Sequence, residues 1–391
     1  MIFKNLVLYN FSSKLHKLGT DSRPEVLQNV SIEFEDGIIK RLFHSGNEEG
    51  IDLKGKWVIP GFLDTHSHPI FCGDRSEEID LRKEIGYEGV LKMGGGIYKT
   101  VEATKKCSEE SLYVESKNRL NKMMENGTVA MEVKTGYGLD YNNEEKMLRV
   151  AERLRKDGFD LKITLLAHVP EKGMDEMDYL AEFKKMMSDF YPRYDYVDVF
   201  CDNGAFSINF LAEVLKHAKE IGVPARLHLN ELANLGALEI LRDYNIKTLD
   251  HMLETSEGEL EGINEIINVL PITYLFLNKR NQFYSLLRKY KKAIALGSDM
   301  SPNSYVYSIP FVIAISRQIT PFTLDELLAA STINAAYSID KEKEYGNIEA
   351  GKKASFIILD GNPNKIGYEF YHDPVFEVIK EGKPVRGEID F

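Results

Sequence analysis

The clearest chemical signal in this sequence is a short run, Asp64-Thr65-His66-Ser67-His68, which directly follows an apolar stretch. Alternate residues of an extended strand point to the same side, so the imidazoles of His66 and His68 can face one ion together. A compact pair of imidazole nitrogens suits Zn or Fe. The pair alone is weak evidence, because two surface histidines in a loop would give the same pattern.

Two further candidate ligands lie at or just after the ends of apolar runs much later in the chain. His228 lies in the run 225–229, and Asp299 follows the run 293–297. In a barrel of parallel strands the active site forms where the strands end, so such side chains converge. Lys134, if carbamylated, could bridge a second ion, but the sequence offers too few other ligands for one. We therefore predict one divalent metal, Zn or Fe, with room for a water ligand, held by His66, His68, His228 and Asp299.

Four polar residues at the same predicted rim could take part in the chemistry. Glu231, three residues after His228, and Asp299 are candidates for accepting a proton from a metal-activated water. His251 suits an electrophilic or proton-transfer role, and His168 is similar. The alternatives stay open, since Glu231 could be a solvated loop residue and each histidine a hydrogen-bonded structural one.

Eight short apolar runs could position these residues, and amphipathic helical patterns such as 143–156 and 209–221 lie between several of them. Continuous apolar runs of this length are typical of parallel strands that are buried on both faces. The alternation predicts an α/β fold, a (β/α)8 TIM-like barrel over residues 57–342. The runs are 57–63, 128–134, 162–167, 197–200, 225–229, 246–250, 268–274 and 293–297.

Both ends of the chain have a different pattern. The strand-like runs 30–34 and 38–42 are separated by Glu35-Asp36-Gly37, and a DG pair between such runs indicates a hairpin. Runs 355–359 and 375–380 are strand-like too. We therefore predict a small β-sandwich domain that is assembled from residues 1–56 together with 343–391.

Composition narrows the function classes. The 391 residues carry a net charge of −12, so long-range attraction to nucleic acid or to an anionic membrane is not expected. No apolar run is long enough to span a membrane, and the N-terminus lacks a signal-peptide pattern. The three cysteines are widely spaced, without CxxC, which favours free thiols in a reducing compartment. The predicted location is the cytoplasm.

Several longer stretches resemble one known group of enzymes in order and approximate spacing. They are Pro60-Gly61-Phe62-Leu63-Asp64-Thr65-His66-Ser67-His68, Phe71-Cys72-Gly73-Asp74-Arg75, Gly94-Gly95-Gly96-Ile97, Lys134-Thr135-Gly136-Tyr137-Gly138-Leu139, Asp198-Val199-Phe200-Cys201-Asp202-Asn203-Gly204-Ala205-Phe206-Ser207, Asn234-Leu235-Gly236-Ala237, Asp250-His251 and Thr332-Ile333-Asn334-Ala335-Ala336. The first stretch resembles the first-strand signature of the amidohydrolase superfamily. The others are similar to its imidazolonepropionase family and cover nearly the whole chain.

The resemblance implies a function. Enzymes of that family open the ring of 4-imidazolone-5-propanoate with water in histidine degradation. The resemblance also implies that the protein is a homodimer. His66, His68, His228 and Asp299 match its metal ligands, and Glu231 and His251 match residues around the attacked carbonyl. The small-molecule substrate carries a carboxylate, for which a guanidinium offers a matching pair of donors. Residues at positions that hold the substrate in the family are Arg75, Tyr87, Tyr137 and His168.

One segment departs from the family pattern. After the metal aspartate the family reads Asp-Phe-Asn-Pro-Gly-Ser, whereas this chain reads Asp299-Met300-Ser301-Pro302-Asn303-Ser304. Ser301 therefore stands at a substrate-contacting position. This difference keeps open a related amidohydrolase that acts on another cyclic amide, or a heterocycle deaminase. A more remote alternative is a non-catalytic metal-binding protein, which would need none of Glu231, His251 and Arg75.

Overall fold

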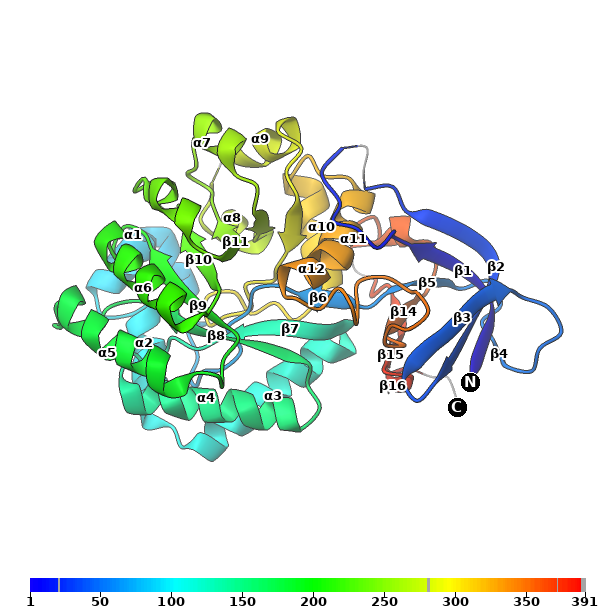
Figure 1. Cartoon of the computed structure of the whole chain (residues 1–391), viewed down its shortest axis with the longest axis horizontal. Coiled ribbons are helices and arrows are strands. Elements are labelled where there is room, and N and C mark those ends of the chain that lie inside the picture. The colour runs from blue at the N-terminus through cyan, green and yellow to red at the C-terminus, as the bar shows by residue number, and fades with distance from the viewer. Residues whose placement is uncertain (20–21, 280–281, 371, 388–391) are drawn as a thin grey trace.

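The computed structural model describes residues 1–19, 22–279, 282–370 and 372–387, apart from the side chains at 82, 87, 88, 91 and 92. Figure 1 shows two units, a barrel wrapped by helices and a smaller β domain that carries both chain termini. The predicted (β/α)8 barrel and the predicted β domain from the two ends of the chain are both confirmed.

Within the described residues, eight parallel strands form the barrel wall in their sequence order. Hydrogen bonds between segments that extend the first and last strands close it: the Asp299 amide donates to His66 O (3.0 Å) and the His68 amide donates to Met300 O (2.7 Å). The strands are β6 (Phe62–Asp64), β7 (Thr128–Lys134), β8 (Leu161–Ala167), β9 (Tyr196–Cys201), β10 (Ala225–Leu229), β11 (Ile246–His251), β12 (Ile266–Val269) and β13 (Ile294–Leu296).

The predicted strand over 57–63 is two strands that lie in different sheets. β5 (Trp57–Pro60) pairs with strands of the β domain, and only β6 belongs to the barrel. Gly61 stands between them, where an added Cβ would lie only 2.6 Å from a methyl group of Val129. A single apolar run does not show that the chain passes from one sheet to the other at a glycine.

The predicted strand over 268–274 is wrong in its second half. β12 ends at Val269, and Pro271 begins the helix α8 (Pro271–Phe276). Proline suits the first turn of a helix, because no amide hydrogen is needed there. A short buried helix and a buried strand are both continuously apolar, so periodicity does not separate them.

Helices cover the outside of the barrel, and their boundaries follow local capping chemistry. Ser207 caps the start of α6 (Ile208–Ile221), and Gly222 caps its end in a left-handed conformation. Thr323 and Glu326 form the capping box of α11 (Leu324–Ser331). Within the described residues the other α-helices are α1 (Glu78–Lys92), α2 (Ile97–Lys106), α3 (Glu109–Glu125), α4 (Tyr141–Lys156), α5 (Glu176–Phe190), α7 (Glu257–Gly262), α9 (Phe283–Lys289), α10 (Ile309–Ile319) and α12 (Ile333–Ser338). Two 3-10 segments are η1 (Ala237–Asp243) and η2 (Pro363–Lys365).

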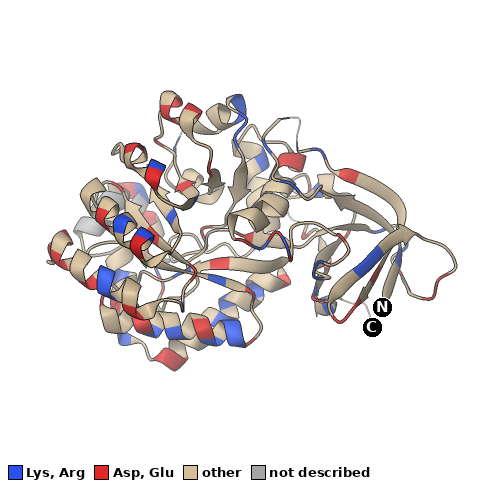
Figure 2. Cartoon of the chain, in the orientation of Figure 1, with Lys and Arg blue, Asp and Glu red and all other residues tan. Residues whose placement is uncertain are grey.

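Acidic and basic residues are mixed along the outer helices. Figure 2 shows both signs along α3 and α4, where Arg149 pairs with Glu109 and Arg153 pairs with Glu110. Such exposed pairs contribute little stability each, about 0–1 kcal/mol. None of the helices in the described part of the chain is both long and apolar enough to cross a membrane.

The β domain is one sheet that folds over an apolar core. Ile38 in the edge strand β3 (Ile38–His44) forms an isolated bridge with Lys353, which precedes β14 (Phe356–Leu359). Phe3, Phe34 and Phe356 meet edge to face inside it. The strand order is β16 (Lys383–Arg386), β15 (Val375–Lys380), β14 (Phe356–Leu359), β5, β1 (Ile2–Asn10), β2 (Glu25–Glu35) and β3 (Ile38–His44), with β4 (Ile51–Asp52) beside β1.

A small charged cluster joins the barrel to the β domain. Asp160, which precedes β8, lies 2.8 Å from both Lys341 Nζ and Lys353 Nζ, and Tyr345 donates a hydrogen bond to it. Burial would raise the pKa of Asp160, but hydrogen bonds from the two lysines outweigh it and hold the pKa below its ordinary value. Asp160 is therefore ionised at neutral pH.

The prediction of free thiols is wrong for two of the three cysteines. Cys72 and Cys107 form a disulfide between the loop after the first barrel strand and the end of α2, while Cys201 is a buried free thiol. The pair is separated by 35 residues in sequence, and only the packing of α2 brings the two Cα atoms to 6.6 Å. Spacing in the sequence gave no indication of this proximity.

Candidate metal centre and active site

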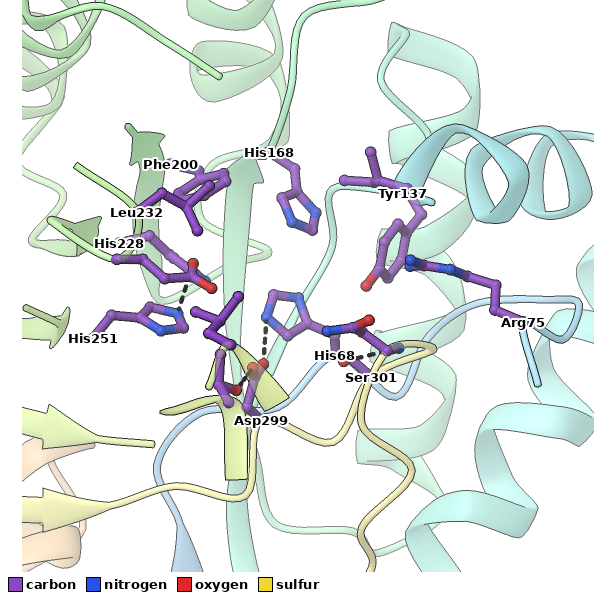
Figure 3. A pocket seen from close by; sticks show the side chains of 15 residues that line it. His68, Arg75, Tyr137, His168, Phe200, His228, Leu232, His251, Asp299 and Ser301 are labelled. Carbon is purple, nitrogen blue, oxygen red and sulfur yellow. Dashed lines mark hydrogen bonds and ion pairs between the residues drawn. The ribbon is translucent and has the colours of Figure 1, made fainter. Parts of the chain in front are cut away.

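The carboxyl ends of the barrel strands enclose a cavity of 90 Å³ that is lined mainly by polar side chains. Figure 3 shows how the labelled residues turn toward its centre from different strands and loops. The lining residues are His68, Arg75, Ile97, Tyr137, His168, Phe200, His228, Glu231, Leu232, His251, Thr273, Leu277, Asp299, Ser301 and Asn303.

The structure brings the four predicted metal ligands together. His66 Nε2 and His68 Nε2 lie 3.2 Å apart, and Asp299 Oδ1 lies 3.7 Å from the first and 3.5 Å from the second. The His66 and His228 rings are 4.4 Å apart, centroid to centroid. Ligand atoms around a tetrahedral Zn²⁺ at about 2.0–2.1 Å are themselves about 3.3 Å apart. The spacing of His66, His68 and Asp299 therefore fits one ion, while His228 shares a second group with His66 and His251.

Two buried carboxylates fix the orientation of the histidine rings. His66 Nδ1 lies 2.7 Å from Asp250 Oδ2, and His228 Nδ1 lies 2.7 Å from Asp198 Oδ2. A carboxylate accepts, so Nδ1 of each ring carries the proton and Nε2 keeps its lone pair. Sequence analysis found Asp198 and Asp250 only as parts of longer motifs and gave neither a role.

Burial keeps His66 and His68 neutral. It lowers the pKa of both His66 and His68 well below the ordinary value, and neighbouring cations and imidazoles act in the same direction. A neutral imidazole binds a cation, whereas a protonated one repels it. Neutral nitrogen donors together with one carboxylate are the chemistry that Zn or Fe needs, so the residues present fit the predicted ion.

Asp299 is held at the junction that closes the barrel. The Thr273 hydroxyl from α8 donates to Asp299 Oδ2, which leaves Oδ1 facing His66 and His68. The backbone of Asp299 is left-handed (φ 49°), a conformation that costs energy for a residue other than glycine. Burial raises the pKa of Asp299 to about 6. Thr273 was missed because the sequence placed it in a strand.

Glu231 and His251 face each other across the cavity. His251 Nε2 lies 3.6 Å from Glu231 Oε2; His251 is buried and Glu231 is half-buried. Asp202 holds the Glu231 loop by accepting from the amides of Glu231 (2.6 Å), Leu232 (3.0 Å) and Ala233 (2.9 Å). Burial raises the pKa of Glu231 well above its ordinary value, with Asp299 and Asp202 acting in the same direction. Glu231 is thus suited to hold a proton.

Arg75 reaches the opposite side of the cavity, beside Tyr137 in Figure 3. Its Nε donates to Glu78 Oε2 (2.9 Å), and Glu78 Oε1 accepts from the amide of Gly96 (3.0 Å). Among the described residues, Arg75 Nη2 has no hydrogen-bond partner although it is buried. One edge of the guanidinium is therefore anchored, while the other offers a donor. The glycine run at 94–96 supplies the amide that completes this support.

The other predicted substrate contacts have different outcomes. Tyr137 and His168 line the cavity with ring centroids 5.2 Å apart. The side chain of Tyr87 lies outside the part of the chain that the structure describes. Ser301 lines the cavity, but its hydroxyl also accepts from the amides of Asn303 and Ser304 (3.3 Å each). Asn303, which sequence analysis did not place in the site, lines the cavity beside it.

A family model agrees with this geometry. The model of the amidohydrolase family matches residues 57–389, which include the barrel and the C-terminal strands. The match therefore spans well over half of the chain and contains every residue of the cavity described above.

Relatives with curated names cover nearly the full chain. An imidazolonepropionase from Thermoplasma volcanium is 33% identical over 378 residues, which is 95% of this chain and 94% of the relative. One from Clostridium tetani is also 33% identical, with 94% of both chains covered. A probable imidazolonepropionase from Homo sapiens is 33% identical over 88% of this chain and 85% of the relative.

Solved structures share the fold at much lower identity. A 5-methylcytosine deaminase from Klebsiella pneumoniae aligns with a TM-score of 0.74 at 15% identity, covering 100% of this chain and 98% of that one. A guanine deaminase from C. acetobutylicum aligns with a TM-score of 0.67 at 16% identity, covering 98% and 99%. At such identities the likeness supports the architecture alone.

Proposed function

The chain belongs to the amidohydrolase family and, within it, to the imidazolonepropionase family, and from that premise we propose that its cavity hydrolyses 4-imidazolone-5-propanoate to N-formimidoyl-L-glutamate. The observation that carries the proposal is the pairing of two features in one cavity. His66 offers a ligand atom within 4.8 Å of those of His68 and Asp299, and also within 4.8 Å of those of His228 and His251. The buried Nη2 of Arg75, which has no hydrogen-bond partner among the described residues, lies at the same cavity.

We assign one Zn or Fe ion to His66, His68, His228 and Asp299. When bound, the ion supplies Lewis acidity and lowers the pKa of a water to about 7. Asp250 and Asp198 keep the two buried histidines turned toward it. Thr273 does the same for the carboxylate of Asp299.

Glu231 and His251 carry the proton and charge transfers in this proposal. Glu231 accepts the proton of the attacking water, since its pKa is raised and its loop is fixed by Asp202. His251, a buried neutral imidazole, donates to the carbonyl oxygen as negative charge develops there. The C–N bond of the ring then breaks, and the proton on Glu231 returns to the ring nitrogen. Asp299 is the alternative proton acceptor.

Arg75 binds the propanoate through its free edge. A carboxylate between Arg75 and Tyr137 would place the ring beside His168 and His251, which line the same cavity. The net charge of −12 makes a local cation necessary for an anionic substrate. Ser301 and Asn303 form the adjoining wall, where they would meet the ring.

The direct test is an ultraviolet assay with freshly generated imidazolone propanoate, paired with elemental analysis of the purified protein. We expect loss of the imidazolone absorbance and one Zn or Fe per chain. Stoichiometric metal without turnover of this or any other cyclic amide would instead support a non-catalytic metal-binding protein.

The variant Arg75→Met makes the test more specific, because methionine lacks the guanidinium donors but replaces the aliphatic part of the arginine side chain. Losing a hydrogen bond to a charged group costs about 1.5–3 kcal/mol, so we expect KM for the propanoate to rise roughly 10- to 100-fold with little change in kcat. An imidazolone without the propanoate arm is the matched control and should show no difference between the two proteins. An unchanged KM for the propanoate would refute the role of Arg75.

A second candidate function rests on Ser301, which stands where the family has a substrate-contacting asparagine. A heterocycle deaminase would release ammonia, whereas ring opening releases none. Measuring ammonia over a panel of cyclic amides and amino-substituted heterocycles separates the two. The cytoplasmic location and the homodimer stay predictions, and light scattering of the purified protein tests the second.

A further inference from the structure

A fully buried lysine lies one layer below the metal-binding residues. Lys134, the last residue of β7, places its Nζ 2.8 Å from Glu132 Oε1, 2.9 Å from Asp198 Oδ2 and 3.6 Å from Asp250 Oδ2. It does not line the cavity, so neither substrate nor water in the cavity explains its presence. The function proposed above leaves Lys134 without a role.

The two aspartates beside Lys134 are the ones that orient the histidines. Asp198 Oδ2 faces both Lys134 and His228 Nδ1, and Asp250 Oδ2 faces both Lys134 and His66 Nδ1. The remaining oxygens also accept: Asp198 Oδ1 from the His228 amide (3.1 Å) and Asp250 Oδ1 from the side chain of Asn268 (2.7 Å). One ammonium group thus touches both supports of the metal site.

The Nζ of Lys134 helps to fix the position of these carboxylates. Asp198, Asp250 and Glu132 are all fully buried, so water cannot take the place of the ammonium group as a partner. An aspartate that loses this partner can turn away from Nδ1 of its histidine, and the ring is then free to rotate or to carry its proton on Nε2. Carbamylated Lys134 would add a further anion among three carboxylates, so it is excluded as a bridging ligand.

We propose that Lys134 is a positioning residue that holds Asp198 and Asp250 as hydrogen-bond acceptors, and thereby presents the Nε2 atoms of both His66 and His228 to the metal. Glu132 faces two cations, Lys134 and Arg226, whose Nε lies 3.7 Å from Glu132 Oε1. The inference concerns metal affinity and histidine tautomer, so it can fail while the proposed hydrolysis stands.

The test compares two variants, and neither of them removes Lys134 while its buried partner Glu132 stays charged. Glu132→Gln keeps Lys134 between the two aspartates, and Glu132→Gln with Lys134→Met removes both members of the pair, which limits the cost of an uncompensated charge. Zn²⁺ affinity is measured on metal-stripped protein by competition with a chelator. Loss of support behind metal-ligating histidines typically costs about 10- to 100-fold in affinity, and we expect this loss in the double variant but not in Glu132→Gln.

A second measurement reads the tautomer directly. Long-range ¹H–¹⁵N spectra of histidine-labelled, metal-free protein should show the Nδ1-protonated form of His66 and His228 in Glu132→Gln, and a mixture of tautomers in the double variant. Lys292→Met is the matched control for losing an ammonium group, because Lys292 Nζ donates to the backbone carbonyls of Glu261 and Ile263 and not to the aspartates behind the metal site. It should leave both readouts unchanged.

Folding of each variant is checked by circular dichroism and thermal unfolding. If single Lys134→Met folds, it should lose Zn²⁺ affinity to the same extent as the double variant. A folded double variant that binds Zn²⁺ within threefold of Glu132→Gln, with unaltered tautomers, overturns the proposal. A loss of affinity in Lys292→Met of the same size would also overturn it, since the effect would then be a general consequence of losing a buried lysine.

Discussion

The interior of the barrel and the core of the β domain are both fully buried, but they are made of opposite kinds of side chain. Below the cavity lie Lys134, Arg226 and Asp250, whereas the sheet of the β domain folds over Phe3 and Phe356. Removing a charge from water costs several kcal/mol unless it is paired, while burying an aromatic ring is favourable by itself. The barrel carries this cost where its charges face the proposed metal ligands, whereas none of the described residues of the β domain lines the cavity.

The largest effect is expected when a side chain at the centre of the polar interior is removed. We expect His228→Ala to abolish stoichiometric metal binding and to lower kcat/KM by at least about 10³-fold, because a required ligand and its fixed geometry are lost together. Elemental analysis and the ultraviolet assay measure both effects. A variant that keeps its metal and its turnover would show that His228 is not a ligand.

Truncation in the apolar core of the β domain should lower the unfolding free energy but leave metal binding and kcat unchanged. Phe356→Ala removes a ring that packs edge to face against Phe3 and Phe34, and such truncations cost about 3–5 kcal/mol in unfolding free energy. Urea denaturation measures the loss. The folded fraction should keep its metal and its kcat, since none of the described residues of the β domain lines the cavity. Loss of metal from a folded Phe356→Ala protein would contradict the division between the two interiors.

The smallest effect is expected where the two units meet. Asp160→Asn removes a partly buried charge that is paired with Lys341 and Lys353, and we expect it to lower the unfolding free energy at pH 7 by about 1–3 kcal/mol. The folded-state pKa of Asp160 lies below the ordinary value of 3.8. Its contribution is therefore complete above that value and is lost as the pH falls through the folded-state pKa.

Urea unfolding of wild type and Asp160→Asn at several pH values measures this dependence. The difference between the two proteins should narrow as the pH falls below about 4, the ordinary range of an aspartate. Lys247→Met, which breaks a more exposed pair with Asp340 at the barrel, is the matched control. A gap between wild type and Asp160→Asn that stays constant down to the lowest pH would show that Asp160 contributes through packing alone.

Local patterns in the sequence were sufficient for the fold class and for the ligand set that we propose. The i, i+2 spacing of His66 and His68 indicates a shared face whatever the rest of the fold, and the glycine turn at Gly37 marks a hairpin. His228 and Asp299 could be associated with them because active sites of parallel barrels collect at one end of the strands. The pairing of His66 and His68 and the hairpin depend only on neighbouring residues, whereas the association of His228 and Asp299 also needs the fold class.

Only the tertiary structure decided what supports those ligands. Asp198 reaches His228, and Asp250 reaches His66 across 184 residues of sequence, because neighbouring and opposite strands meet inside a closed barrel with a particular stagger. Thr273 reaches Asp299 because Pro271 begins a helix where an apolar run also allows a strand. Contacts between distant segments depend on how the strands are registered and closed, and no local periodicity contains that information.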